Sequence, residues 1–481
     1  MKNLKLLSLA LILISTQAEA VIINVPAQYN TIQSAINVSN NSDTILVQPG
    51  TYFENINFRG KSIVLTSKYY LNSDYSFIES TIINGSNPVY PDSASCVVMG
   101  NHEDSNTVLQ GFTLTGGTGT KWLDIHNGFY YTEGGGIIME FASPTIRNNI
   151  IRDNEAINIS NGSKSSGGGA IRCGDSNPKI LNNLIINNRG RYGAGIVFNY
   201  SAGLVKNNVI LKNYGGEDYG GAGIWMVGTN SATVVTIENN TIVQNRSVGP
   251  NARGGAVQVF SIRAVIINNI VWGNTQTIGL QINTSGGGIV NATYNNVQGG
   301  FTGAGNIDIN PLFDSTNFYL NNNSPCIDKG DSSIIYNDPP DQNNPLIAKW
   351  PSKGSVRNDI GAYGGPGSKV IAGNLVEIRN HGNSTVPSKF YLAQNYPNPF
   401  NPKTIITFTV PPGVEGIVKL IVYDALGKEI AELMNESKSA GKYSVVFDTG
   451  NEGKNISSGI LFYSLQVNDI IVASKKMILL K

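Results

Sequence analysis

The sequence predicts an all-β protein in which a parallel β-helix, a solenoid of stacked coils, precedes a small C-terminal β-sandwich. Three observations support this prediction. A short asparagine motif recurs through the middle of the chain, a glycine-rich segment precedes a short apolar strand in each repeat, and residues 389–481 contain alternating apolar runs separated by turn residues. Short strands of period two between Gly and Asn corners are typical of β-structure, and a recurring motif is typical of a solenoid.

Residues 1–20 have the three parts of a secretory signal peptide. Lys2 and Lys5 precede an apolar run at residues 6–14, and Ala18-Glu19-Ala20 offers small residues for cleavage before Val21. No later stretch approaches the roughly 18 apolar residues of a membrane-spanning helix. We therefore expect an exported protein, secreted or held at the cell surface, with no transmembrane anchor.

The bulk composition argues against some functions. The 481 residues are enough for two or three domains. Lys and Arg number 34 against 33 Asp and Glu, so no overall charge favours nucleic acid or anionic membrane as a partner. The three cysteines cannot form a disulfide framework, and Cys173, in an alternating run, is expected to be a small buried apolar residue.

The repeat has the pattern Asn-Asn-x-[Ile/Val]-x-x-Asn. Copies start at Asn148, Asn182, Asn207, Asn239 and Asn268, and a truncated sixth copy is expected to begin at Asn295. An apolar residue stands two positions before each of the five full copies. Because the spacing varies while the motif is constant, we expect coils of one fixed path that carry loops of different length.

The physical chemistry of these residues favours a stack of coils. Asn accepts the left-handed backbone of a sharp corner, and equivalent Asn amides on coils about 4.8 Å apart can bond to each other. The inward Ile and Val residues would form ladders, since no single coil can bury its own apolar face. An antiparallel sandwich with chance repeats is the alternative, and five copies of the motif argue against it.

Several segments resemble right-handed parallel β-helix proteins of the pectin-lyase-like superfamily. Residues 25–36 read Val-Pro-Ala-Gln-Tyr-Asn-Thr-Ile-Gln-Ser-Ala-Ile, and residues 47–54 read Val-Gln-Pro-Gly-Thr-Tyr-Phe-Glu. The resemblance, which covers residues 21–365, implies a right-handed solenoid with a capping helix at Thr-Ile-Gln-Ser-Ala-Ile and a first-coil turn at Pro-Gly-Thr-Tyr. It implies little about activity, because these motifs are largely structural.

The C-terminal part is expected to be a separate domain. Residues 366–388 are polar and without repeats, as in a linker. Alternating runs then follow at residues 404–410, 418–424, 443–448 and 460–467, which predict a β-sandwich in residues 389–481. The stretch Tyr-Pro-Asn-Pro-Phe-Asn-Pro at residues 396–402 and the terminal Lys-Met-Ile-Leu-Leu-Lys resemble the type A sorting domain of the type IX secretion system. This resemblance implies the outer-membrane secretion machinery as a partner; a carbohydrate-binding or adhesive sandwich is the alternative.

One face of the solenoid is a candidate site for extracellular polysaccharide. The residue after the first apolar position of each glycine-preceded strand is expected to point outward, which gives the column Ile138, Arg172, Val197, Trp225 and Gln258. The loops entering these strands add aromatic and charged residues, among them Trp122, His126, Tyr130, Tyr219, Arg189 and Arg246. Aromatic rings suit the apolar faces of sugars and polar groups suit their hydroxyls. From these sets we predict substrate-binding roles for Trp122, Tyr130, Arg172, Tyr219, Trp225 and Gln258. Ordinary exposed loops are the alternative.

The catalytic prediction is less defined. A glycosidase needs two carboxylates, about 5.5 Å apart for retention or about 6.5–9.5 Å for inversion, and Glu133, Glu140, Glu217 and Asp218 are available. A lyase needs a base together with Arg or Ca²⁺ to neutralise a uronate, and Arg172 or Arg253 could serve. Aspartates near the end of the solenoid could hold Ca²⁺ or simply cap turns, the reading we favour: Asp328, Asp331, Asp338, Asp341 and Asp359. Three functional classes stay open: a polysaccharide lyase or hydrolase, a noncatalytic carbohydrate-binding or adhesive protein, and a structural spacer.

Overall fold

The computed structural model describes residues 19–156, 162–215, 220–229, 232–314, 317–371, 390–395, 398–411, 416–438, 441–450 and 456–480. The chain divides into two compact units, Met1–Gly373 and Asn374–Lys481. Residues 1–18 of the expected signal peptide and residues 372–388 of the expected linker lie outside the described residues.

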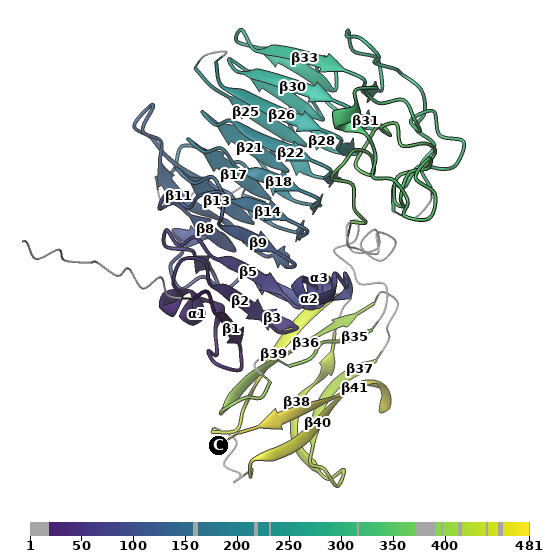
Figure 1. Cartoon of the computed structure of the whole chain (residues 1–481). Helices are drawn as coiled ribbons and strands as arrows, with labels where there is room; N and C mark the ends of the chain where they lie inside the picture. Colours follow the sequence, from purple (N-terminus) through teal and green to yellow (C-terminus); the bar gives the residue numbers. More distant parts are fainter. Residues whose placement is uncertain are drawn as a thin grey trace, which may run out of the picture. The chain divides into compact units, whose positions relative to one another are not determined.

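The first unit is the expected right-handed parallel β-helix, built from three long sheets (Figure 1). Sheet A contains β1 (Ile22–Val25), β2 (Thr44–Val47), β5 (Val64–Ser67), β9 (Val108–Gln110), β14 (Thr145–Arg147), β18 (Lys179–Leu181), β22 (Gly203–Lys206), β26 (Val234–Glu238), β30 (Arg263–Ile267) and β33 (Ile289–Thr293). Sheet B contains β3 (Gly50–Tyr52), β6 (Thr81–Asn84), β10 (Thr113–Thr115), β15 (Ile150–Arg152), β19 (Leu184–Ile186), β23 (Val209–Leu211), β27 (Thr241–Val243), β31 (Ile270–Trp272) and β34 (Asn296–Val297). Sheet C contains β4 (Ile56–Asn57), β8 (Val97–Met99), β13 (Ile137–Glu140), β17 (Ile171–Gly174), β21 (Ile196–Asn199), β25 (Ile224–Val227), β29 (Val257–Phe260) and β32 (Ile282–Ser285).

Each central coil visits sheet A, sheet B, a short fourth sheet and sheet C in turn. The fourth sheet consists of β16 (Glu155–Ala156), β20 (Arg189–Gly190), β24 (Tyr214–Gly215) and β28 (Arg246–Ser247). The long loops join this fourth sheet to sheet C, so the residues that the structure describes in them lie beside sheet C. All neighbouring strands within these four sheets are parallel, as a solenoid requires.

Asparagine shapes two corners of each coil, as predicted. The first Asn of each motif has a left-handed backbone with φ between 51° and 59°, where Asn is tolerated better than most residues. The second and third form two buried ladders in which side-chain amides of successive coils bond at 2.9 to 3.1 Å. The ladders satisfy buried backbone groups at every corner.

One detail of the predicted register is wrong. Asn295 is not the start of a sixth motif but the second member of its pair, because it accepts the ladder bond from Asn269. Tyr294, with φ of 56°, occupies the left-handed corner in place of the first asparagine. The sixth copy therefore begins one residue earlier.

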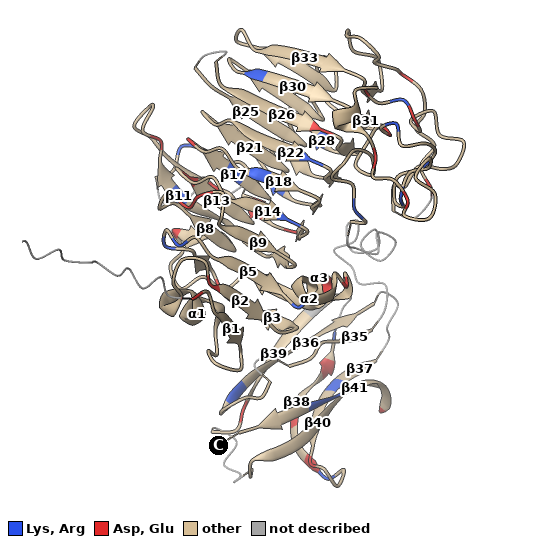
Figure 2. Ribbon diagram, in the orientation of Figure 1, with Lys and Arg blue, Asp and Glu red and all other residues tan. Residues whose placement is uncertain are grey.

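Inward Ile and Val residues fill the core of the solenoid. The apolar column before the Asn pairs is fully buried at Ile146, Ile180, Val205, Ile237 and Ile266. Cys96, Cys173 and Cys326 are free and buried, which confirms the prediction that Cys173 packs as an apolar residue. Figure 2 shows few charged residues along the stacked strands.

The N-terminal end of the solenoid is covered by a helix. Helix α1 (Ile32–Val38) begins at the N-cap Thr31 with a capping box to Ser34, and its buried Ile32, Ala35 and Ile36 join the core. Two short helices, α2 (Tyr69–Asn72) and α3 (Ser76–Ser80), follow β5. Helix α1 confirms the helix expected at Thr-Ile-Gln-Ser-Ala-Ile. Between β34 and residue 371 the described chain has almost no regular structure apart from the short η1 (Ile334–Tyr336).

The outward side chains of three corner asparagines bind this irregular C-terminal segment. Asn239 Nδ2 donates to the carbonyls of Asp359 and Gly361, and Asn207 Nδ2 donates to those of Ala362 and Gly364. Asn268 Oδ1 accepts from the backbone of Asp331. The segment is thereby attached along the corner between sheets A and B.

The second unit contains two antiparallel sheets around one core, which confirms the expected β-sandwich. One sheet contains β35 (Tyr391–Leu392), β36 (Lys403–Val410) and β39 (Gly441–Asp448); the other contains β38 (Glu429–Ser437), β37 (Ile417–Tyr423), β40 (Gly459–Val467) and β41 (Ile470–Leu479). The four predicted runs correspond to β36, β37, β39 and β40, whereas β38 and β41 were not predicted. None of the described helices has the length and apolar composition needed to cross a membrane.

Candidate functional site

A β-hairpin covers part of the outer face of sheet C. It consists of β11 (Gly119–Leu123) and β12 (Tyr130–Glu133), and β11 also pairs with β7 (Ser93–Ala94). Trp122 and Tyr131, opposite each other in the hairpin, stack with ring centroids 5.8 Å apart. The hairpin carries these aromatic side chains and Glu133 to sheet C.

Arg172, on β17, is the centre of a buried polar cluster under this hairpin. Its Nε donates to Glu133 Oε2 at 3.1 Å, its Nη1 donates to Glu140 Oε2, and its guanidinium lies 3.3 Å from the Trp122 ring centroid. Glu133 also accepts from Trp122 Nε1 at 2.9 Å and from the Tyr192 hydroxyl. Such contacts compensate the desolvation of the buried charges.

The prediction that Arg172 faces solvent is therefore wrong: its side chain is fully buried. It points outward from the sheet, as the alternation requires, but loop residues fold over it. Ile138, Val197 and Gln258 of this column are also buried. Gln258 forms hydrogen bonds with Ser285 and Asn283 of the protein itself. Trp225 alone of the five stays half-buried, with its ring 4.9 Å from that of Tyr192.

Glu140 lies where the buried cluster meets solvent. Its side chain is 17% exposed while Arg172 beside it has no exposure. A side chain at position 174 would collide with this ion pair, so Gly174 leaves the room that it occupies. Glu140 Oε1 and Arg172 Nη2 are buried and have no hydrogen-bond partner, so each keeps bonding capacity that the protein does not use.

A second polar group lies on the next two coils. His126, from the hairpin, bonds through Nε2 to Asp175 at 3.0 Å, and its ring stacks on Tyr200 at a centroid distance of 3.7 Å. Asp175 directly follows β17, and Tyr200 directly follows β21. Glu140 pairs with Gly174 across the sheet, so strand geometry places its Cα roughly 6 Å from that of Asp175. The two groups therefore form one continuous surface.

The electrostatics of this surface are dominated by carboxylates. Burial raises the pKa of Glu140, Arg172 lowers it, and the negative charges of Asp175 and Glu133 raise it further. Burial likewise raises the pKa of Glu133 against the opposing effect of Arg172. The pKa of Tyr200 is raised by burial and by Asp124 and Asp175. A raised carboxyl pKa favours a protonated Glu140 that can donate a proton.

The remaining predicted residues have varied positions. Tyr130 is exposed on the hairpin, with Lys121 Nζ 5.0 Å from its ring. Glu217, Asp218 and Tyr219 lie outside the described residues. Asp175 and Tyr200 were not predicted as site residues, because they lie one residue beyond the alternating strand positions. Their place directly after the outward-facing fourth strand position was the available signal.

The five aspartates near the end of the solenoid accept hydrogen bonds from backbone N–H groups. Asp331 and Asp341 accept from backbone N–H groups two residues ahead, and Asp328 accepts from the backbone of Ser355. Asp338 accepts from the backbone of Asp359 and Gly365, and Asp359 from that of Asp328 and Lys353. Within the described ranges no three His, Cys, Asp or Glu residues are close enough to hold a metal ion. Asp331 and Asp341 therefore cap turns, whereas Asp328, Asp338 and Asp359 connect segments that are distant in the sequence.

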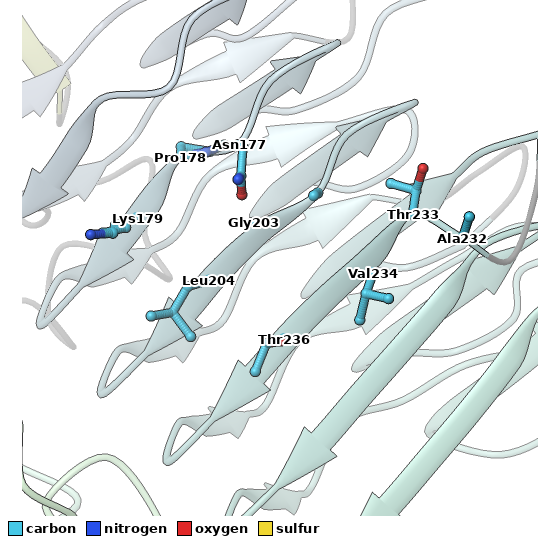
Figure 3. Close-up of a pocket in the computed structure, with 10 residues that line it drawn as sticks. Asn177, Pro178, Lys179, Gly203, Leu204, Ala232, Thr233, Val234 and Thr236 are labelled. Carbon is cyan, nitrogen blue, oxygen red and sulfur yellow. The ribbon is translucent and has the colours of Figure 1, made fainter. Parts of the chain in front are cut away.

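A separate open depression of about 670 Å³ lies on sheet A (Figure 3). The starts of β18, β22 and β26 form it, with Lys179, Leu204 and Thr236 among its lining residues. Lys179 is the one charged residue in that lining, and no carboxylate accompanies it. The depression therefore lacks the paired titratable groups found on sheet C.

The fold and site define a class of protein, a parallel β-helix with a carboxylate-rich polar surface beside a hairpin on one sheet. No protein-family model matches the chain, and no curated protein is significantly similar to it.

Proposed function

We propose that this chain is an exported protein of the pectin-lyase-like, right-handed β-helix type that acts on extracellular polysaccharide along the outer face of sheet C. The observation that carries the proposal is the adjacency of two partly exposed carboxylates, Glu140 and Asp175, on a rigid buried base. Two carboxylates on one sheet surface are the groups that glycoside hydrolysis requires.

In this proposal Glu140 donates its proton to the oxygen of the breaking glycosidic bond. Asp175 accepts a proton from the water that adds to the sugar carbon, so atoms and charge balance over the hydrolysis. His126, bonded to Asp175, orients that carboxylate. Arg172, covered by the hairpin, holds Glu140 in place.

Hydrolysis is favoured over the lyase alternative by the position of Arg172. A lyase needs a positive charge to neutralise the uronate carboxylate. The guanidinium of Arg172 is fully buried between Glu133 and Glu140, so its charge is already compensated. Arg253 is exposed but precedes β29, four coils beyond β13.

A noncatalytic carbohydrate-binding or adhesive function is the second candidate. The ion pair between Glu140 and Arg172 favours it, because this pair restricts the movement of the Glu140 carboxylate. The same surface would then hold a sugar chain without cleaving it.

The test uses the full mature chain and a panel of neutral and uronic polysaccharides, with and without Ca²⁺. The readouts are new reducing ends and absorbance near 235 nm, a wavelength at which unsaturated lyase products absorb. We expect reducing ends without absorbance, and their loss in Glu140→Gln and Asp175→Asn. Glu238→Gln is the matched control, since Glu238 pairs with Lys206 at 2.6 Å on sheet A. Binding without products favours the second candidate, and an absorbance rise refutes hydrolysis.

We also propose that residues 389–481 are a type A sorting domain that engages the outer-membrane secretion machinery. The matching residues and the antiparallel sandwich support this. In a host with a type IX system, the full chain should reach the cell surface or medium after passing the periplasm. A chain truncated after residue 388 should stay in the periplasm; its release would contradict the proposal.

A further inference from the structure

One corner of the solenoid carries large side chains where the fold needs none. The residues that directly follow the strands of sheet C are in register on successive coils, as the pairing of the preceding residues shows. This corner column contains Phe141, Asp175, Tyr200, Gly228, Ser261 and Gly286. Phe141, Asp175 and Tyr200 occupy its first three positions, on the coils beside the hairpin, and smaller residues occupy the last three.

Phe141 and Tyr200 have left-handed backbones, with φ of 53° and 52°. Bulky residues rarely adopt this conformation, because Cβ then approaches the following carbonyl. Gly286 occupies the same corner with φ of 58°, so glycine fits this position of the fold. Two aromatic residues are therefore kept at strained positions where glycine would relieve the strain.

Burial does not compensate this strain. Phe141 is 37% exposed, and its ring lies 6.1 Å from that of His102. The Tyr200 ring stacks on the partly exposed His126. Tyr294 is a useful contrast: its backbone is also left-handed, but its ring packs against Gly305 at the corner between sheets A and B. His126 bonds to Asp175, and Phe141 directly follows Glu140 in the chain.

We propose that Phe141, Asp175 and Tyr200, with His126 stacked on Tyr200, form a ridge of sugar subsites for an uncharged polysaccharide that runs parallel to the solenoid axis. This proposal rests on the proposed function and specifies its substrate class. Aromatic rings bind the apolar faces of sugars, and coils about 4.8 Å apart repeat at roughly the length of a pyranose unit.

The charge of the surface determines the substrate class. With Glu140 protonated, as the proposed hydrolysis requires, the three carboxylates of Glu133, Asp124 and Asp175 still outnumber the one guanidinium of Arg172. A polyuronate would bring further negative charge to this carboxylate excess, whereas a neutral chain would not. The ridge therefore favours neutral over uronic polymers.

The experiment measures the retardation of the full chain in native gels that contain one soluble polymer each. The neutral polymers are hydroxyethyl cellulose, xyloglucan and galactomannan, and the uronic polymers are polygalacturonate and alginate. The variants are Phe141→Gly and Tyr200→Gly, with Tyr294→Gly as the control that removes an aromatic ring at a left-handed position elsewhere. Thermal unfolding is recorded for each variant.

We expect retardation by at least one neutral polymer. Phe141→Gly and Tyr200→Gly should weaken it roughly 3- to 10-fold, the range of one aromatic contact, while Tm is kept or raised. Tyr294→Gly should bind as the unaltered protein does. Unchanged binding in both ridge variants overturns the ridge but leaves the proposed function intact if products still form. Stronger retardation by the uronic polymers overturns the neutral substrate class. No retardation and no products with any polymer overturn both proposals.

Discussion

The guanidinium of Arg172 lies 3.3 Å from the centroid of the Trp122 indole ring, and both side chains bond to the same oxygen of Glu133. One arginine thereby connects β17 to a hairpin about forty residues earlier in the chain. Its role is to attach the hairpin to sheet C and to hold Glu140 at the surface.

The ion pair of Arg172 and Glu133 should be strongly coupled. Arg172→Met leaves Glu133 buried without a compensating charge and should lower the free energy of unfolding by about 3–5 kcal/mol. The double variant Arg172→Met/Glu133→Gln should lose less than the two single variants added together. Urea unfolding of all four proteins measures this coupling. Strictly additive losses would contradict the account of the cluster.

Removing the indole donor should loosen the hairpin. Trp122→Phe keeps an aromatic ring but removes the Nε1–H that donates to the buried Glu133, a bond to a charged group worth about 1.5–3 kcal/mol. Limited proteolysis should then cut the hairpin loop, residues 124–129, faster than in the unaltered protein. Tyr130→Phe, at an exposed position of the same hairpin, serves as the control. Equal cleavage rates in the two variants would refute this role for Trp122.

Substitution of a ladder asparagine should reduce the free energy of unfolding more than substitution of the asparagine at the left-handed corner beside it. Asn208 is fully buried, accepts from Asn183 and donates to Asn240 Oδ1 and to the carbonyl of Ile180. Asn208→Ala should cost at least about 3 kcal/mol, since each buried group left unsatisfied costs about 1–3 kcal/mol. Asn182→Gly, at a corner with φ of 53°, should change stability by less than about 1 kcal/mol. Chemical denaturation measures the free energy of unfolding of both variants. Similar losses of stability in the two would argue against the stabilising role of the ladder.

Stability should fall as pH rises above the ordinary carboxyl range, because of Asp338. Burial and the neighbouring Asp359 raise the pKa of Asp338. The folded protein therefore keeps a proton that the unfolded chain releases, so this contribution is complete below about pH 4 and is lost as pH rises towards the raised pKa. Asp338→Asn should flatten the dependence of Tm on pH between pH 5 and pH 9. An identical slope in both proteins would contradict this assignment.

The sequence was informative where the structure depends on local, repeated chemistry. The Asn corners, the Ile and Val columns and helix α1 depend on residues within one coil, and their periodicity is visible in the sequence. The solvent exposure of Arg172 was predicted wrongly because the hairpin that covers it comes from an earlier part of the chain. Strand alternation predicted that the Arg172 side chain points outward from the sheet, but it could not predict which residues cover that side chain.

The candidate site was predicted only in part for a related reason. Arg172 was in the outward column, Glu140 was among the available carboxylates, and His126 was among the loop residues. Asp175 and Tyr200 come one residue after the strands, where the alternation ends and the left-handed corner changes the direction of the chain. Their meeting with His126 depends on the fold of the hairpin. Asn295 was assigned to the wrong register because Tyr294 replaces the asparagine of the corner.

The most direct test of the polysaccharide site is a crystal structure of Glu140→Gln soaked with oligosaccharides of the polymer that binds best. We expect sugar density on the outer face of sheet C, in contact with Gln at position 140, Asp175 and the ring of Phe141. Density in the depression on sheet A instead, against Lys179, Leu204 and Thr236, would contradict the assignment of the site to sheet C.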